Sequence, residues 1–242
     1  MIIAVDTHTH TDISHHAYST LEENLIAAKK KGMQGIAVTN HGPALDSDGA
    51  HLWHFSSLKN FPPYVKGLRL FKGAEVNIMN PEGDIDLDSY SLAPLEIVIA
   101  SMHTPCFDVK LGPKAVTMGY INALTRHKKI NIVGHMGDGR YKCDYRAVLS
   151  KVKETNRIVE INHHSFDVRK GSGDNCREIA LICKELEIPV VLSTDAHFSE
   201  DVGEVENSAR MLREIDFPKE LILNTSLEKL TAYLEAISHK DR

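Results

Sequence analysis

Short runs of apolar, mostly β-branched residues recur along the chain, and almost every one stops at a histidine or a carboxylate. Seven such runs span residues 2–5, 35–39, 70–74, 95–100, 130–133, 158–161 and 189–192. Runs that are apolar throughout are typical of strands buried on both faces of a parallel sheet. Parallel α/β barrels carry their chemistry at the carboxyl ends of the strands, so the polar residues after these runs are the first candidates for a site.

Segments with the helical period lie between the runs. Ser19–Thr20–Leu21–Glu22 has the pattern of a capping box and predicts a helix that ends at Lys31, before Gly32. Further helices are predicted over residues 113–128, 144–155, 174–187, 204–215 and 226–237. Strands that alternate with helices predict a parallel sheet, and seven or eight such units predict that the sheet closes into a barrel.

Two stretches fit this alternation less well. Residues 221–223 form either a stunted eighth strand or a connector. Residues 43–63 are rich in polar and aromatic side chains and are predicted to be a long loop, which at such a rim is more often functional than idle. Neither stretch suggests a second domain, and we expect a single domain over residues 1–242.

Composition narrows the functional class. The net charge of -5 and a pI near 6.3 give no basic track for nucleic acid. No apolar stretch reaches the ~20 residues that span a bilayer, and no export signal is recognised, so we expect a cytoplasmic protein without membrane partners. The four cysteines include no C-x-x-C pair, and Cys176 and Cys183 have the spacing of small core residues on a helix.

The polar residues at the run ends have the chemistry of metal ligands. In a strand, residues two apart point to the same side, so His8 and His10 can bind one ion together. One such pair is a weak signal, but Asp195 and His197 form a second pair of the same type. Nine groups exceed what one or two ions take from a protein, whereas three ions with a bridging carboxylate account for them. Eight of these ligands are His8, His10, His41, Glu75, His103, His135, Asp195 and His197, and the ninth, His16, is implied by the resemblance described next.

The motifs around these residues resemble the PHP (polymerase and histidinol phosphatase) domain superfamily. The resemblance covers nearly the whole chain. It is carried by His8–Thr9–His10, His16–Ala17–Tyr18–Ser19–Thr20, Thr39–Asn40–His41–Gly42–Pro43, Gly73–Ala74–Glu75–Val76–Asn77, Ser101–Met102–His103, Gly134–His135 and Ser193–Thr194–Asp195–Ala196–His197.

Two further runs, Trp53–His54–Phe55 and residues 169–178, resemble a bacterial subgroup of stand-alone phosphatases. This resemblance implies a distorted (β/α)7 barrel of the TIM type with three zinc ions at the carboxyl rim. It also implies that three sets of residues each hold an ion. The sets are His8, His10, Glu75 and Asp195; Glu75, His103 and His135; and His16, His41 and His197.

The chain departs from the family pattern at several positions. Asn40 stands where the family commonly has an aspartate, so it supplies no charged partner to orient His41. His15 lies beside His16 and competes with it, although the motif favours His16. Met136 replaces a proline, and His163 and His164 stand where relatives carry small polar residues. We expect these last two histidines not to be ligands.

The net charge of the predicted metal site indicates the class of substrate. Three divalent ions among neutral imidazoles, Glu75 and Asp195 leave an excess of positive charge that fits a phosphate monoester dianion. Water bound to the metal, with its pKa lowered toward ~7, supplies a bridging hydroxide as nucleophile. Asp195 or another metal-bound water is a candidate proton donor to the leaving oxygen. Arg169, Lys170 and His54 are candidate substrate-binding residues.

We therefore expect a metal-dependent phosphatase of small phosphate monoesters. The alternatives are an amidohydrolase-like hydrolase of amides or lactones, a phosphodiesterase or nuclease, and a non-catalytic metal-binding module. Imidazole-rich sites accept zinc, manganese or iron, and zinc is expected here. The expected partner is a small phosphorylated substrate, nucleic acid is not expected to bind, and a homo-oligomer remains open.

Overall fold

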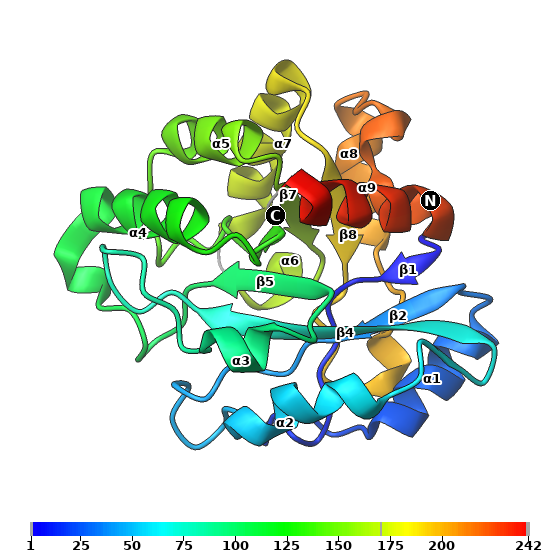
Figure 1. The fold of residues 1–242 in the computed structure, drawn as a ribbon. Coiled ribbons are helices and arrows are strands. Elements are labelled where there is room, and N and C mark those ends of the chain that lie inside the picture. Colours follow the sequence, from blue (N-terminus) through cyan, green and yellow to red (C-terminus); the bar gives the residue numbers. More distant parts are fainter. Residues whose placement is uncertain (1, 170, 241–242) are drawn as a thin grey trace.

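Seven parallel strands form a nearly closed barrel with helices around it (Figure 1). The computed structural model describes residues 2–169 and 171–240. The strands pair in the order β1-β2-β4-β5-β6-β7-β8, and β3 (Tyr64–Val65) adds an antiparallel pairing to β4. The parallel strands are β1 (Val5–Asp6), β2 (Gly35–Val38), β4 (Leu68–Asn77), β5 (Ile97–Ser101), β6 (Ile132–Val133), β7 (Ile158–Asn162) and β8 (Val190–Ser193). The predicted α/β barrel of the TIM type is confirmed.

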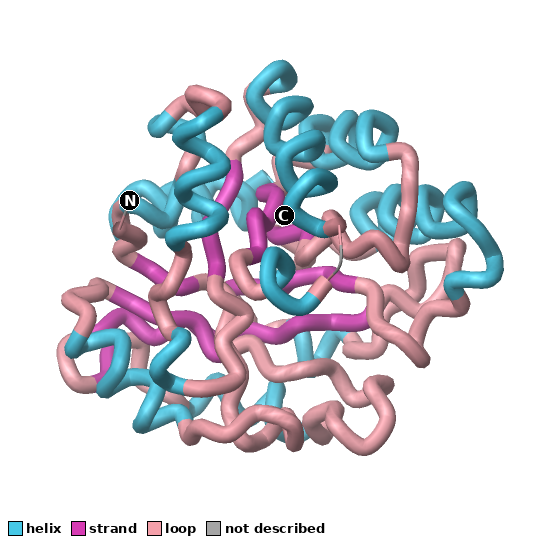
Figure 2. Tube along the Cα trace, turned by 180° about the vertical axis from the view of Figure 1, so that it is seen from behind, coloured by secondary structure: helices cyan, strands magenta, loops and turns pink. Residues whose placement is uncertain are grey.

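The helices surround the strands, as the view from the opposite side shows (Figure 2). They are α1 (Leu21–Lys30), α2 (Leu52–Ser57), α3 (Ser89–Leu92), α4 (Gly112–Arg126), α5 (Tyr145–Glu154), α6 (Ser165–Val168), α7 (Ser172–Leu186), α8 (Glu206–Glu214) and α9 (Leu227–Lys240). The six predicted helices correspond to α1, α4, α5, α7, α8 and α9. None of the helices in the described residues is long and apolar enough to cross a membrane.

Two local predictions need correction. The capping box of α1 lies one residue later than expected, because Thr20 caps the helix and Glu23 returns the bond to the Thr20 backbone. The stretch 43–63 is not one long loop, since it contains α2 and the 3-10 turn Leu58–Asn60, which bury Phe55 and Leu58.

The stretch 221–223 is a connector built from two 3-10 turns, Lys219–Leu221 and Leu223–Thr225. It nevertheless helps to close the barrel. Ile222 forms a parallel bridge to Val190 of β8, and the buried Asn224 side chain bonds to the N–H and C=O of Leu192 and to the C=O of Val5. The side chain of Asn224 thus joins β8 to β1 where the two strands do not pair directly.

The apolar side chains divide into two layers. The larger one lies between the strands and the outer helices. The smaller one fills the barrel with residues such as Val5, Phe71 and Ile99, and Leu230, Leu234 and Ile237 of α9 pack onto it. In Figure 1, α9 crosses in front of the strands. Because this helix covers one end of the filled barrel, the polar residues at the opposite, carboxyl end form the other face.

Candidate metal centre

The nine side chains predicted as ligands lie together at the carboxyl end of the barrel. Glu75 lies within β4, and the others follow strands: His8, His10 and His16 follow β1, His41 follows β2, His103 follows β5, His135 follows β6, and Asp195 and His197 follow β8. Each strand delivers its side chain to the same rim because the strands are parallel and in register.

Glu75 is the centre of the cluster. Its Oε1 lies 2.9 Å from Nε2 of His135 and 3.5 Å from Nε2 of His103. Its Oε2 lies 2.8 Å from Nδ1 of His41 and 3.3 Å from Nε2 of His8. Burial alone would raise the pKa of this fully buried carboxyl, but the imidazoles of His8, His103 and His41 hold the pKa well below its usual value. Glu75 is therefore a carboxylate with both oxygens directed at imidazoles.

The first predicted ligand set is compact. One ligand atom from each of His8, His10, Glu75 and Asp195 lies within 4.8 Å of the others. Nε2 of His10 lies 3.0 Å from Nε2 of His8 and 3.1 Å from Oδ1 of Asp195. All four residues are buried, so two carboxylates and two imidazoles share one pocket of the size that a single ion fills.

The second predicted set is equally close. Nε2 of His135 lies 3.1 Å from Nε2 of His103, and both nitrogens face Oε1 of Glu75. Burial lowers the pKa of His103 to about 3, against the opposing effect of Glu75, so this imidazole is neutral at pH 7 and can bind a metal.

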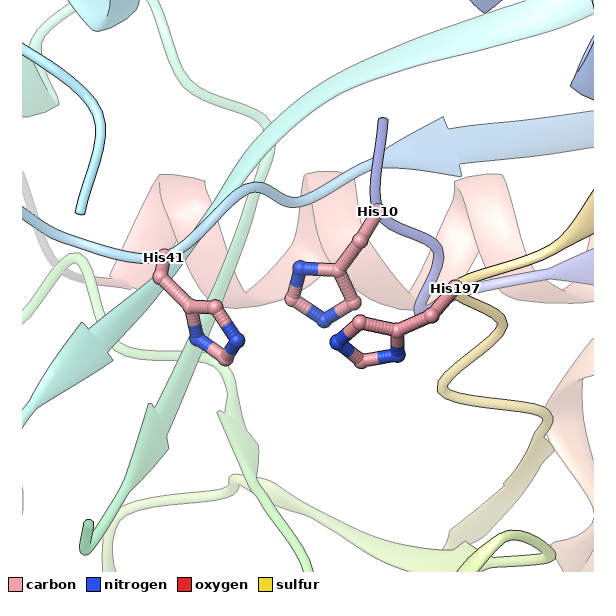
Figure 3. A group of neighbouring side chains, drawn as sticks. All are labelled: His10, His41 and His197. Carbon is pink, nitrogen blue, oxygen red and sulfur yellow. The ribbon is translucent and has the colours of Figure 1, made fainter. Parts of the chain in front are cut away.

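The third predicted set is arranged differently from expectation. His41 lies in three compact groups: one with His10 and His197 (Figure 3), one with His16 and Asp48, and one with Glu75 and His103. His16 is close to His197, with 4.3 Å between ring centroids, but its Nδ1 faces Oδ1 of Asp48 at 2.7 Å. Asp48 thus joins the imidazoles of this part of the cluster. Nδ1 of the neighbouring His15 instead faces the C=O of Ser47 at 2.9 Å.

Several histidines use one ring nitrogen for an outward hydrogen bond, which turns the other nitrogen to the cluster. Nδ1 of His8 lies 2.6 Å from Oε1 of Glu160, Nδ1 of His103 lies 2.7 Å from Oδ1 of Asn77, and Nδ1 of His197 lies 2.8 Å from the C=O of Asp195. Outward partners of this kind fix the tautomer and the ring orientation of metal ligands.

Glu160, Asn77 and Asp48 were missed by the sequence analysis. Glu160 carried the clearest signal, because it interrupts the apolar run 158–161 of a buried strand with a charge. Its side chain is fully buried, and the carboxylate also accepts hydrogen bonds from the Ser193 hydroxyl and from the backbone N–H of His135. A buried charge needs such partners.

Asn40 acts on His41 indirectly, through the loop after β1. Its Oδ1 accepts hydrogen bonds from the backbone N–H of Thr11 and from the hydroxyl of Ser14. The Ser14 oxygen in turn accepts from the backbone N–H of His41 and lies 3.5 Å from Nδ1 of His10. The amide therefore acts on both histidines through Ser14, without a charge.

The three residues predicted to bind substrate have different surroundings. Arg169 lines the cavity beside the cluster, and its guanidinium lies 3.3 Å from Oδ2 of Asp195 and 3.5 Å from Oδ2 of Asp138. Lys170 lies outside the described residues. Nε2 of His54 lies 3.2 Å from the amide nitrogen of Asn40, behind the cluster, and His54 is not among the described residues that line the cavity.

The cavity over the cluster has a volume of about 1300 Å³. His16, His41, His103, Asp195 and His197 form its base, and His164 also borders it. His163 and His164 lie outside the compact groups of potential ligands in the described part of the chain. Five of the nine predicted ligands thus border the cavity, and the other four lie buried beneath it.

Some buried polar atoms of the cluster have no hydrogen-bond partner, and their chemistry fits divalent cations. Oε2 of Glu75, Nδ1 of His41 and Nε2 of His197 are buried without a hydrogen-bond partner, although the first two lie 2.8 Å apart. Asp195 has a φ of +56°, a strained value for a residue with a side chain, and such strain concentrates at functional sites. Imidazole and carboxylate donors in this geometry are the ligands that zinc takes in proteins.

Comparisons with known proteins agree with this geometry. Residues 6–171 match the family model described as the PHP domain. The chain is 42% identical over 241 residues to a probable phosphatase of Thermoanaerobacter sp. (strain X514), covering 99% of this chain and 98% of the relative. It is 42% identical over 234 residues to a probable phosphatase of Caldanaerobacter subterraneus subsp. tengcongensis, covering 96% and 91% of the two chains.

Among solved structures, the fold is similar to that of the histidinol phosphate phosphatase of Lactococcus lactis subsp. lactis, in a complex with zinc, L-histidinol and phosphate. The TM-score is 0.61 at 13% sequence identity, covering 90% of this chain and 95% of the other. At this identity the similarity concerns the fold.

Proposed function

The chain belongs to the PHP domain family and is a phosphatase. On that premise, we propose that it hydrolyses small phosphate monoesters with the help of three divalent metal ions, and that these ions are zinc. The observation that carries the proposal is Glu75, a buried carboxylate whose two oxygens face imidazoles from four different strand ends. Such convergence is costly without cations to compensate the clustered donors.

We assign the ions to the three predicted sets, with Glu75 shared between the first two. His8, His10, Glu75 and Asp195 hold one ion, and Glu75, His103 and His135 hold the second. His16, His41 and His197 hold the third, with Asp48 as the charged partner of His16. When bound, the ions supply a water molecule with a lowered pKa and positive charge for the phosphate oxygens.

Charge favours a phosphate monoester over a neutral substrate. Three divalent ions bring six positive charges, and four carboxylates lie among or directly behind the ligands: Glu75, Asp195, Asp48 and Glu160. The remainder of about two positive charges matches a phosphate monoester dianion. An amide or a lactone brings no charge to offset this excess, so the amidohydrolase alternative is disfavoured.

The chain's own residues orient the phosphate. Arg169 is held by Asp138 and Asp195 at the cavity wall, and we propose that its guanidinium donates hydrogen bonds to phosphate oxygens. Burial would raise the pKa of Asp195, but His8 and His10 hold it well below its usual value, so the group is ionised at neutral pH. Asp195 is therefore better suited to hold a cation and Arg169 than to donate a proton to the leaving oxygen.

The test combines metal analysis with phosphate release from monoesters, diesters and a nucleic acid strand. We expect about three zinc-class ions per chain, hydrolysis of monoesters, and loss of activity with a chelator that is restored by metal. Glu75→Gln should lower kcat by about a thousandfold or more, because it removes the shared carboxylate, whereas Glu185→Gln on the surface should not. Metal binding without release of phosphate from any ester would refute the proposal.

A further inference from the structure

The cavity wall next to the metal centre carries two cationic side chains that the proposed hydrolysis does not use. Arg140 and Lys142 line the same cavity as His103, Asp195 and Arg169. Both are exposed, with 56% of the Arg140 side chain accessible to solvent. They follow β6, on the segment between His135 and α5, so they lie at the rim that carries the ligands.

Arg140 is held in place by a buried carboxylate. Its Nε lies 3.1 Å from Oδ1 of Asp138, and its Nη2 lies 2.6 Å from Oδ2. Asp138 is only 2% exposed, and its Oδ1 also accepts a hydrogen bond from the backbone N–H of Arg140 at 2.9 Å. Its oxygen Oδ2 also lies 3.5 Å from Nε of Arg169. One carboxylate oxygen thus places the two guanidinium groups side by side.

This wall has an excess of positive charge. Asp138 is shared between two arginines, so it compensates only one of them, and Arg169 shares Asp195 with the metal centre. Within the described residues, Lys142 has no ion pair, although it borders the cavity. An exposed ammonium and a preorganised guanidinium are the groups that bind oxyanions.

The carboxylates on the wall define where an anion fits. Asp174 stands in the first turn of α7 and repels an anion from that helix start. Asp201 borders the cavity and also the neighbouring hollow lined by His163 and Glu204. The favourable place for an anion is therefore beside Arg140 and Lys142, next to Arg169.

We propose that Arg140 and Lys142 bind a second anionic group on the leaving part of the substrate. The substrates are then phosphate monoesters that also carry a carboxylate or a second phosphate. The inference rests on the proposed function, because it assumes that Arg169 and the metal centre hold the phosphate that is cleaved. A cavity of about 1300 Å³ has room for both groups and the short carbon chain between them.

Two matched substrate pairs test the inference. In the first pair, 2-phosphoglycerate carries a carboxylate where glycerol 2-phosphate carries a hydroxymethyl group. In the second, fructose 1,6-bisphosphate carries a second phosphate that fructose 6-phosphate lacks. We expect the wild-type enzyme to prefer the member with the extra anion by about tenfold in kcat/KM in at least one pair, since a charge-assisted hydrogen bond contributes on that scale. The pair that shows the preference identifies the kind of anion.

Substitutions then assign the preference to residues. Arg140→Gln and Lys142→Met should each lower kcat/KM for the doubly anionic substrate by about tenfold, through KM, and leave its matched partner within about twofold. Arg146→Gln is the control, because Arg146 is an exposed arginine of α5 paired with Glu185.

Two outcomes would overturn the inference: no preference for either extra anion in the wild-type enzyme, or an equal loss for both members of a pair in Arg140→Gln. The second outcome would mean that Arg140 acts only by positioning Asp138 and Arg169. If the wild-type enzyme releases phosphate from no ester at all, the proposed function itself fails.

Discussion

Replacement of Glu160 by glutamine should weaken metal binding although Glu160 is not among the proposed ligands. Each carboxylate oxygen accepts two hydrogen bonds. Oε1 faces Nδ1 of His8 and the Ser193 hydroxyl, both at 2.6 Å, and Oε2 accepts from the backbone N–H of His135 at 2.7 Å and from the amide of Asn162 at 3.2 Å. A glutamine has one oxygen and one NH2 group, so either orientation places a donor against donors.

The size of the effect follows from these contacts. A hydrogen bond to a charged group contributes about 1.5–3 kcal/mol, and the substitution removes at least one such bond to a ligand or to its backbone. Because about 1.4 kcal/mol corresponds to a tenfold change in an equilibrium constant, we expect metal affinity to fall by about 10- to 100-fold. The ions bound by His8 and His135 should be the ones affected.

The assay is a titration of the metal-free protein with zinc in competition with a chromophoric chelator. Circular dichroism and chemical denaturation of the metal-free variant show whether it is folded, so that lost affinity is not confused with unfolding. Glu185→Gln serves as the control, because it also removes one carboxylate, from an exposed pair with Arg146 that contributes little.

A folded Glu160→Gln protein that binds zinc within about twofold of the wild-type affinity would refute the reasoning. It would mean that the ring of His8 and the backbone at His135 are held well enough by the rest of the barrel. An equal loss in Glu185→Gln would also refute it, since the effect would then come from net charge.

Three further changes probe other parts of the structure. In the metal-free protein, the pKa of His103 is about 3 instead of 6.5, so its neutral form stabilises the fold fully above pH 6.5. This stability should be lost at up to about 1.4 kcal/mol per pH unit as the pH falls from 6.5 toward 3, because only the unfolded chain takes up the proton. Denaturation measures the free energy of unfolding at pH 7 and at pH 5, and these two values should differ less in His103→Gln than in the wild-type protein. An unchanged difference would contradict the assignment. Asn224→Ala should lower the free energy of unfolding by about 3 kcal/mol, since it strips partners from three buried backbone groups. The half-buried Asn207, whose side chain accepts a hydrogen bond from Arg210, is the control, because Asn207→Ala should have little effect; denaturation with urea measures both. Asp48→Asn should lower the affinity of the protein for one of the three ions by about tenfold and leave the affinity for the other two unchanged. Metal analysis after dialysis against a chelator measures this, and an equal loss of all ions would rule out a separate role for Asp48.

The positions of the proposed ligands were predictable because the information is local. Each ligand except His16 follows or ends an apolar run, and parallel strands bring their carboxyl ends to one rim whatever the details of packing. His16 was indicated only by the family resemblance of its motif. His8 and His10, or Asp195 and His197, also share a side of the chain simply because they are two residues apart. The parallel sheet and its closure into a barrel could be predicted from the same alternation.

The residues that support the ligands could not be found in this way. Glu160 and His8 are 152 residues apart in the chain, and nothing near either residue indicates the other. Asp48 lies in a stretch that we expected to be an irregular loop, and it is placed beside His16 by a turn before α2, in which the N–H of Asp48 bonds to the C=O of Leu45. His54 shows the converse, because a histidine in a family-like motif turns out to bond to Asn40 behind the cluster.

The join between β8 and β1 makes the site dependent on residues that lie far from it. Every proposed ligand precedes Phe198, yet the two edges that carry His8, His10, Asp195 and His197 are connected by Asn224 and covered by α9. A protease that cuts ahead of Asn224 would leave a polypeptide with all the proposed metal-binding groups, held between β1 and β8 only by direct bonds such as that from the Asp195 N–H to the His8 C=O. Such a fragment should be inert even though it retains the whole set of binding motifs.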